Sequence, residues 1–445
     1  MQVLIQSLLR MRTVFSVLLL LFFQALVAQE GPGLSRRVTC SADTTEQYAL
    51  YLPTHYAPEK MSPLLLFLDP GARGSFPVNK YQSLAERYGI IMAGSFNSRN
   101  FNGASSEHAF IAIYNDLVNK YSIDPGMIWI SGFSGGSRAA AALAMAYPAI
   151  QGVIGCGAGF ADMEESSLKK LKAYVAVTGD RDMNFGELLD NHEQLERMGV
   201  NDLLLQFDGG HEWPPLPQME LALSWLIDNK TPLNDNILER VSAKADSGIL
   251  YAALLEAEQL MKISAVKEKA ILLVSAIKQK PGLTADQILF EQVMEEERKS
   301  INEFALAFGQ LLSGGPFEEE NWTSKAGKIA QWEKDKNRYR QLSGQRCYNQ
   351  AIATCQEYYF QFMNTGNYSK ALNAANVFLC FDPQNPNGYY MLARAEAGLG
   401  NKKRTVKDLN ESVKRGLTWN SRIENDPLLL QLFSIEELKK IVVKN

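Results

Sequence analysis

The sequence predicts an α/β fold followed by an all-helical region, and three observations support this prediction. Short apolar runs alternate with amphipathic stretches over residues 47–228, which is typical of strands and helices around a mostly parallel sheet. After residue 232 the strand signals stop, and Leu, Ala, Glu and Lys recur at helical spacing. A glycine-rich turn at residues 132–136 joins an apolar run to an alanine-rich stretch, as a strand-to-helix connection does.

The elements of the first part are expected to alternate strictly along the chain. Strands are predicted at Tyr48–Leu52, Leu64–Asp69, Ile90–Ser95, Met127–Ser131, Gly152–Cys156, Tyr174–Thr178 and Leu203–Phe207. Helices that cover both faces of the sheet are predicted at Tyr81–Tyr88, Glu107–Tyr121, Ser137–Tyr147, Gly186–Met198 and Gln218–Asp228. We therefore expect an α/β domain over residues 38–230, a helical region over 232–345 and helical repeats over 346–445.

Composition and charge narrow the possible partners. The chain has 445 residues, of which 46% are hydrophobic and 21% charged, so it can bury two or three ordinary cores. A formal net charge of -4 gives no basic excess that would neutralise a phosphate backbone. We therefore expect no nucleic-acid partner.

The first 28 residues read as a signal peptide. Arg10 and Arg12 precede an apolar run from Val14 to Phe23, and small residues between Gln24 and Ala28 suit a cleavage site. The run is far shorter than the roughly 20 residues that cross a bilayer. The sequence thus predicts an exported protein, periplasmic or secreted, without a transmembrane segment in its mature chain.

Ser134 is predicted to be a nucleophile. It stands at the centre of Gly-Phe-Ser-Gly-Gly, between a predicted strand and a predicted helix, as a G-x-S-x-G nucleophile elbow requires. Gly132 and Gly136 would be needed because a Cβ at either position would collide with neighbouring backbone. The N–H of Gly135, the residue after this serine, can then donate to a developing oxyanion.

A serine nucleophile needs a base, and His211 is the candidate. Of the four histidines, His55 and His108 precede the serine and His192 lies inside a predicted helix. His211 instead lies in the loop that follows the last predicted strand. Functional residues of parallel sheets lie in such loops, at the carboxyl ends of the strands.

An acid and a second oxyanion donor complete the expected machinery. The strand Tyr174–Thr178 runs into Gly-Asp-Arg-Asp, so Asp180 and Asp182 compete to orient the base. The second donor should come from the loop after Leu64–Asp69, where the N–H of Ala72 is our candidate.

Together these motifs resemble the secreted esterase branch of the α/β hydrolases, which includes polyhydroxybutyrate depolymerases and feruloyl esterases. The resemblance covers about residues 38–228 and is carried by GFSGGSRAA, GDRD and GGHEWP. It implies hydrolysis of a small-molecule or polymer-borne ester through an acyl-enzyme, without a cofactor or metal. Because these hydrolases carry Gly-x-x-Asp, it favours Asp182 as the acid and leaves Asp180 to bond to turn amides. One departure is that Pro70-Gly71, preceded by Asp69, replaces the usual His-Gly.

The substrate pocket is predicted less sharply. Phe133 and Trp213 adjoin the nucleophile and the base, and Asn97, Arg99 and Phe101 follow a strand at the same edge of the sheet. Trp213 could equally pack the His211 loop in place. No phosphate-binding loop and no zinc-ligand spacing occurs in the sequence.

The end of the chain contains a repeat. Gly366-Asn367 recurs as Gly400-Asn401 after 34 residues, the period of a helix–turn–helix solenoid. The positions of its turn aromatic, its small packing residue and its final proline are filled by Tyr368, Ala371 and Pro383. The stretch resembles tetratricopeptide repeats over residues 352–420; Thr405 and Leu417 depart from the pattern and suggest a capping unit. The resemblance implies a peptide or protein partner, and a packing appendage is the alternative.

Two other functions stay open at this point. A serine peptidase of the prolyl-oligopeptidase type would share the elbow and the order of the three residues. A repeat-based binding or scaffold protein with a non-catalytic hydrolase domain would need neither the nucleophile elbow nor the three catalytic residues. The five cysteines are too few and too scattered for a disulfide scaffold: Cys40, Cys156, Cys347, Cys355 and Cys380. Cys355 and Cys380 could meet as a disulfide across a helical hairpin, whereas two buried thiols that act as small apolar side chains are the expected state.

Overall fold

The chain forms two compact units in a computed structural model that describes residues 32–100, 103–160, 163–231, 233 and 236–443. The first unit comprises residues up to 180, 187–247 and 253–280, and the second comprises 181–186, 248–252 and 281–445. The predicted signal peptide and Phe101 lie outside the described residues. Among the residues described, no helix is both long and apolar enough to cross a membrane.

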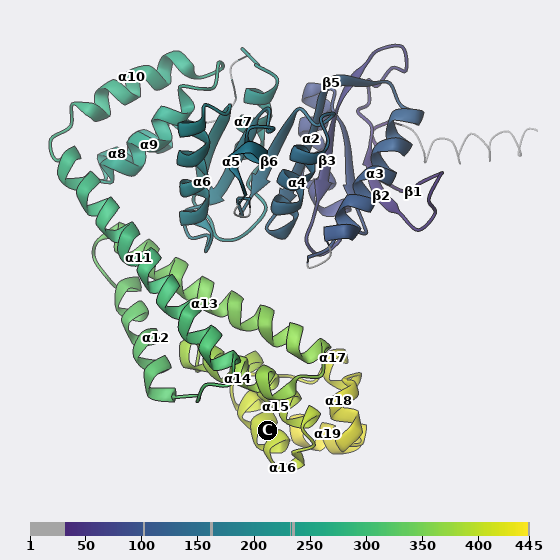
Figure 1. Cartoon of the computed structure of the whole chain (residues 1–445), viewed down its shortest axis with the longest axis vertical. Helices are drawn as coiled ribbons and strands as arrows, with labels where there is room; N and C mark the ends of the chain where they lie inside the picture. Colours follow the sequence, from purple (N-terminus) through teal and green to yellow (C-terminus); the bar gives the residue numbers. More distant parts are fainter. Residues whose placement is uncertain (1–31, 101–102, 161–162, 232, 234–235, 444–445) are drawn as a thin grey trace, which may run out of the picture. The chain divides into compact units, whose positions relative to one another are not determined.

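The first unit is built on an eight-stranded mixed sheet (Figure 1). The strands are β1 (Arg36–Thr39), β2 (Gln47–Tyr51), β3 (Ser62–Leu68), β4 (Ile91–Ser95), β5 (Ile123–Phe133), β6 (Gly152–Cys156), β7 (Tyr174–Gly179) and β8 (Asp202–Phe207). Their order is β1-β2-β4-β3-β5-β6-β7-β8; β2 is antiparallel to both its neighbours, and the pairs from β4 to β8 are parallel. This arrangement is consistent with the predicted α/β-hydrolase fold.

Helices flank this sheet, and the parallel strands are buried. The helices are α2 (Ser75–Tyr88), α3 (Gly103–Lys120), α4 (Gly135–Ala146), α5 (Glu165–Leu168), α6 (Phe185–Met198) and α7 (Leu216–Leu226). Among these helices, α2 contacts α7, and α3 contacts α4. Because both sheet faces are covered, β3 and β6 are almost entirely apolar, as the sequence indicated.

The sequence did not predict every feature of this unit. The edge strand β1, with the sequence Arg-Arg-Val-Thr, was not predicted because it lacks an apolar run. Beyond the expected boundary at residue 232, α8 (Ile237–Asp246), most of α9 (Leu250–Leu260) and α10 (Lys267–Lys278) still group with the sheet. The end of the strand signal therefore marks the last strand, while the compact unit continues to residue 280.

The parallel strands β3, β4, β5, β7 and β8 all end at the same edge of the sheet. This follows from their parallel pairing, which aligns the carboxyl end of each strand with that of its neighbour. The loops after these strands carry the residues that the sequence singled out, so the fold brings their backbones to a single edge.

The second unit is helical. Its helices are α11 (Leu283–Leu312), α12 (Glu319–Glu333), α13 (Arg338–Asn364), α14 (Tyr368–Phe381), α15 (Pro386–Gly398), α16 (Lys402–Lys414), α17 (Ser421–Glu424), α18 (Pro427–Leu432) and α19 (Ile435–Val442). Successive helices from α12 to α16 contact one another. They enclose one core around Tyr359 and Phe378 and another around Tyr390 and Leu409.

The repeated Gly-Asn pair has the same geometry at both occurrences. Gly366 and Gly400 adopt left-handed φ values of 72° and 75°, and each precedes an asparagine that begins the next helix. The recurrence is therefore a structural repeat of a helix–turn–helix connection. Its membership of the tetratricopeptide class stays a prediction.

The cysteines are free thiols. All five lie within the described residues, and none is in a disulfide. Burial raises the pKa of the Cys156 and Cys347 thiols to about 12, which keeps them protonated near neutral pH. They act as small apolar side chains, as expected.

Candidate active site

Ser134 occupies a strained turn between β5 and α4. Its φ of 53° and ψ of -122° lie where L side chains are rarely found. A Cβ at Gly132 would come within 2.0 Å of the Gly136 carbonyl oxygen, and a Cβ at Gly136 within 2.1 Å of the Leu68 carbonyl oxygen. Both clashes are with backbone, so the predicted need for glycine at these positions is confirmed.

His211 lies within hydrogen-bonding distance of this serine. It follows β8 in the loop before α7, and its Nε2 is 3.0 Å from the Oγ of Ser134. Both side chains are half-buried. The structure thus brings together two residues 77 positions apart in the chain, in the geometry that a serine and its general base require.

The aromatic ring of Phe133 packs against the imidazole of His211. Its centroid is 4.6 Å from that of the His211 imidazole and 5.7 Å from the nearest ring of Trp213. Phe133 immediately precedes Ser134, so the end of β5 positions Ser134 and also contacts the ring of His211. This buried position makes Phe133 a support of the imidazole.

The two candidate acids differ in their surroundings. Asp180 continues β7, and its Oδ1 accepts a hydrogen bond of 3.2 Å from the backbone N–H of Gly209. A bond to a turn amide was expected for Asp180, but which of the two aspartates orients His211 stays a prediction. Asp182 is fully buried, and its Oδ1 accepts a hydrogen bond of 2.9 Å from the N–H of Asn184. A buried carboxylate three residues after the end of β7 suits the role of orienting His211. The assignment of this role to Asp182 stays a prediction.

The two backbone N–H groups predicted to bind the oxyanion differ in their hydrogen bonds. Gly135 follows Ser134 directly and is the first residue of α4. The first N–H groups of a helix have no acceptor within the helix, so the N–H of Gly135 is a candidate oxyanion donor. The N–H of Ala72 donates to the Asp69 carbonyl at 3.0 Å, and Ala72 has a positive φ of 57°. The free donor that was expected at Ala72 is therefore engaged in its own turn in this conformation.

Asn97 has a structural task. Its Oδ1 accepts from the N–H of Gln47 and its Nδ2 donates to the carbonyl of Thr45, both at 3.0 Å. The side-chain amide thus ties the loop after β4 to the start of β2, and the substrate contact of Asn97 stays a prediction. The exposed Arg99 pairs with Gly71 as an isolated β-bridge, so the loop after β4 lies against the loop after β3.

Trp213 is buried and holds the loop that carries His211. Its indole Nε1 donates to Asp69 Oδ2 at 2.9 Å. The Lys80 ammonium donates to the Trp213 carbonyl at 2.8 Å, and the Tyr81 hydroxyl donates to the Pro214 carbonyl at 2.7 Å. Of the two roles proposed for Trp213, packing the His211 loop is the one that these contacts favour.

Sequence reasoning missed the contribution of α2 and Asp69. The signal was present, because an aspartate stands directly before the Pro70-Gly71 pair that departs from the family pattern. Its meaning depends on Trp213, 144 positions away, and no local pattern indicates that pairing.

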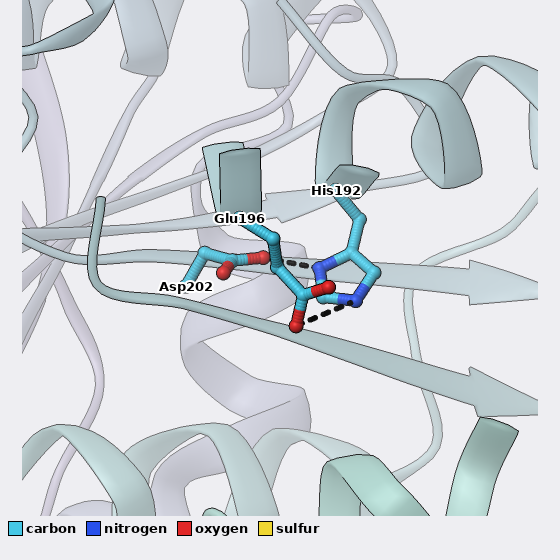
Figure 2. A group of neighbouring side chains, drawn as sticks. All are labelled: His192, Glu196 and Asp202. Carbon is cyan, nitrogen blue, oxygen red and sulfur yellow. Dashed lines mark hydrogen bonds and ion pairs between the residues drawn. The ribbon is translucent and has the colours of Figure 1, made fainter. Parts of the chain in front are cut away.

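His192, Glu196 and Asp202 form the only group among the described residues whose ligand atoms are close enough to hold a metal ion (Figure 2). His192 Nδ1 bonds to Asp202, and its Nε2 is 2.9 Å from the amide nitrogen of Gln259. The Lys262 ammonium is 2.8 Å from Glu196 and 3.8 Å from Asp202. A lysine already supplies the positive charge and both imidazole nitrogens have partners, so these residues fit an ion-pair network that joins α6 and the segment after α9 to β8.

Comparison with known proteins gave structural similarities at low identity. No family model and no curated protein matches the chain. The chain is similar to an esterase from Rhizomucor miehei, with 14% identity over 46% of this chain and 87% of that one at a TM-score of 0.36. A feruloyl esterase module from Clostridium thermocellum shares 14% identity, with coverages of 40% and 82% and a TM-score of 0.34. A thermostable esterase shares 17% identity over 44% of this chain and 62% of its own length, at a TM-score of 0.34. Similarities at this level carry no argument about activity.

Proposed function

We propose that the chain is a serine hydrolase that cleaves carboxylic esters through an acyl-enzyme. The single observation that carries the proposal is the 3.0 Å distance between Ser134 Oγ and His211 Nε2, in a turn whose strain and glycines match a nucleophile elbow. Strained backbone at a non-glycine residue is costly and clusters at functional sites.

The chemistry follows from these groups. Ser134 Oγ attacks the ester carbonyl while His211 Nε2 takes the hydroxyl proton, and the same imidazole then protonates the leaving alcohol. Water attacks the acyl-enzyme in the second half of the reaction, with His211 again taking and returning a proton. Asp182 is the proposed acid that holds the tautomer of His211.

The oxyanion has one donor with a clear position, the N–H of Gly135. Ala72 could add a second only if its N–H turned away from the Asp69 carbonyl. Each such donor contributes about 10²–10³ in rate, so one fixed donor already supports substantial catalysis.

Labelling with a fluorophosphonate tests the proposal directly. The probe should modify the folded wild-type protein and not Ser134→Ala, and ester turnover should fall at least about 10⁴-fold in that variant. Ser83→Ala, at an exposed position of α2, is the matched control and should label like the wild type. Failure of the wild type to label would favour the non-catalytic binding protein.

The bond that is cleaved can be assigned with paired substrates. Turnover of p-nitrophenyl esters of increasing acyl length is compared with that of aminoacyl p-nitroanilides. Esters should be the better substrates, whereas faster cleavage of the anilides would establish the peptidase alternative.

A further inference from the structure

The carboxylate of Asp69 links two loops of the candidate site. Asp69 directly follows β3 and is 0% exposed. Its Oδ1 accepts a hydrogen bond from the backbone N–H of Gly71 at 2.9 Å, within the loop expected to hold the oxyanion. Its Oδ2 accepts from the indole of Trp213, also at 2.9 Å, two residues beyond the proposed base. One buried group therefore joins the loop after β3 to the loop after β8.

Arg73 keeps this carboxylate charged. Its Nε and Nη2 each lie 2.9 Å from one carboxylate oxygen, while its side chain is 57% exposed. Burial alone would raise the pKa of Asp69, but the hydrogen bonds from Arg73, Trp213 and Gly71 outweigh it and hold the pKa below its usual range. An ionised carboxylate accepts at both oxygens, so it can serve both loops simultaneously.

A chain of ring contacts leads from Asp69 to the base. The Trp213 indole packs on the Phe133 ring, and that ring packs on the imidazole of His211. The Trp213 carbonyl is also fixed by Lys80 of α2. A shift of the indole would therefore move the surface against which the imidazole rests.

From these contacts we infer that Asp69 is a positioning residue for the proposed hydrolase, holding the oxyanion loop and the histidine loop in one arrangement around Ser134. The inference rests on the proposed function. A purely local role, stabilising the turn at the end of β3, is the competing explanation. The two differ in whether the reactivity of Ser134 depends on the bond to Trp213.

Two substitutions separate these explanations. Asp69→Asn keeps one acceptor oxygen but places N–H donors where the second stood, so either Trp213 or the Gly71 turn loses its partner. Trp213→Phe keeps an aromatic ring beside Phe133, and it removes the indole N–H together with part of the ring system. If Asp69 acts through Trp213, both variants disturb the same link, and the double variant should be little worse than the poorer single one.

Asp116 offers a matched control. It is also a buried aspartate paired with a basic residue four positions later, with Lys120 Nζ at 2.7 Å. It too accepts from a backbone N–H, that of Ser41, and from an aromatic side chain, the hydroxyl of Tyr48. Asp116→Asn therefore removes a comparable buried charge without touching the residues around Ser134.

The experiment measures the rate constant and the final extent of fluorophosphonate labelling, together with kcat and KM for a p-nitrophenyl ester. Misplaced catalytic groups cost up to about 100-fold, so Asp69→Asn and Trp213→Phe should each slow labelling and lower kcat by at least about tenfold, with a smaller change in KM. The final extent should reach that of the wild type, because Ser134 is still present. Asp116→Asn should label at the wild-type rate.

Each remaining outcome is decisive. Labelling of Asp69→Asn and Trp213→Phe at the wild-type rate would overturn the inference while leaving the proposed function intact. Strictly multiplicative losses in the double variant would also overturn it, because Asp69 would then not act through Trp213. Absence of labelling in the wild type would instead defeat the proposed function itself. Should Asp69→Asn fail to fold, Trp213→Phe alone still tests the link, since Asp69 then keeps Arg73 and Gly71.

Discussion

The backbone strain at Ser134 can be measured apart from the loss of its hydroxyl. Replacing Ser134 by alanine or by glycine removes the hydroxyl and its bond to His211 in both cases. Only glycine adopts φ 53° and ψ -122° without strain. The difference in stability between the two variants therefore reports the cost of this conformation, less the greater loss of conformational freedom of glycine.

The expected size of the effect follows from two opposing contributions. A non-glycine residue in such a region costs about 1–3 kcal/mol. Glycine in turn lowers the free energy of unfolding by roughly 0.5–1 kcal/mol relative to alanine, because it loses more conformational freedom on folding. We expect Ser134→Gly to be more stable than Ser134→Ala by about 1 kcal/mol, which corresponds to a Tm higher by roughly 2–4 °C.

Urea unfolding followed by tryptophan fluorescence, together with thermal unfolding, measures this difference. Ser83, an exposed residue within α2, provides the control pair. There the glycine variant should be less stable than the alanine variant by about 1 kcal/mol, the opposite sign, because the backbone is helical. An alanine variant of Ser134 that is more stable than the glycine variant by about 0.5–1 kcal/mol, as expected where the backbone is unstrained, would show that this turn is not strained.

The remaining predictions test other parts of the site. Gly132→Ala should abolish labelling of Ser134 in whatever protein still folds, because its Cβ would meet a backbone carbonyl at 2.0 Å; normal labelling would contradict the need for glycine. Asp182→Asn should lower kcat about 10⁴-fold, whereas Asp180→Asn should lower it much less, since an amide oxygen can still accept from the Gly209 N–H; the reverse ranking in steady-state kinetics would exchange their roles. Because the folded pKa of Asp69 is depressed, its contribution to stability is complete above the unfolded pKa of about 3.9 and is lost as the pH falls through the folded value. The stability difference between wild type and Asp69→Asn in urea should therefore shrink below about pH 4, and a constant difference would rule out the ionised form as its source.

The pairing of Ser134 with His211 was predictable because it depends on order and topology. A glycine-flanked serine after a strand and a histidine after the last strand must meet at one edge if the sheet is parallel. The strand pattern was also readable, since both faces of the sheet are covered and its strands are continuous apolar runs. The short strand β1 (Arg36–Thr39) has no such run and gave no signal.

The oxyanion loop could not be predicted from the sequence. Whether the N–H of Ala72 is free depends on the fold of a single turn, in which Asp69 accepts from Gly71, Ala72 and Arg73 through its carboxylate and its carbonyl. A pattern of residue types does not specify which of these bonds form. The same holds for Asn97, whose position after a strand suggested a pocket and whose amide is used to hold the start of β2.

The departure at Pro70-Gly71 becomes understandable when it is considered with residues far from it. An aspartate before this pair would be costly to bury alone, because an isolated buried charge lacks compensation. Arg73 supplies the opposite charge from the same loop, and Trp213 supplies an N–H donor from the loop of the proposed base. The carboxylate of Asp69 thus accepts from the Arg73 guanidinium and from the Trp213 indole, and each of these polar groups would lack this partner without it. The loop after β3 and the loop after β8 are therefore best regarded as one interdependent unit, and a change in either should be interpreted together with the other.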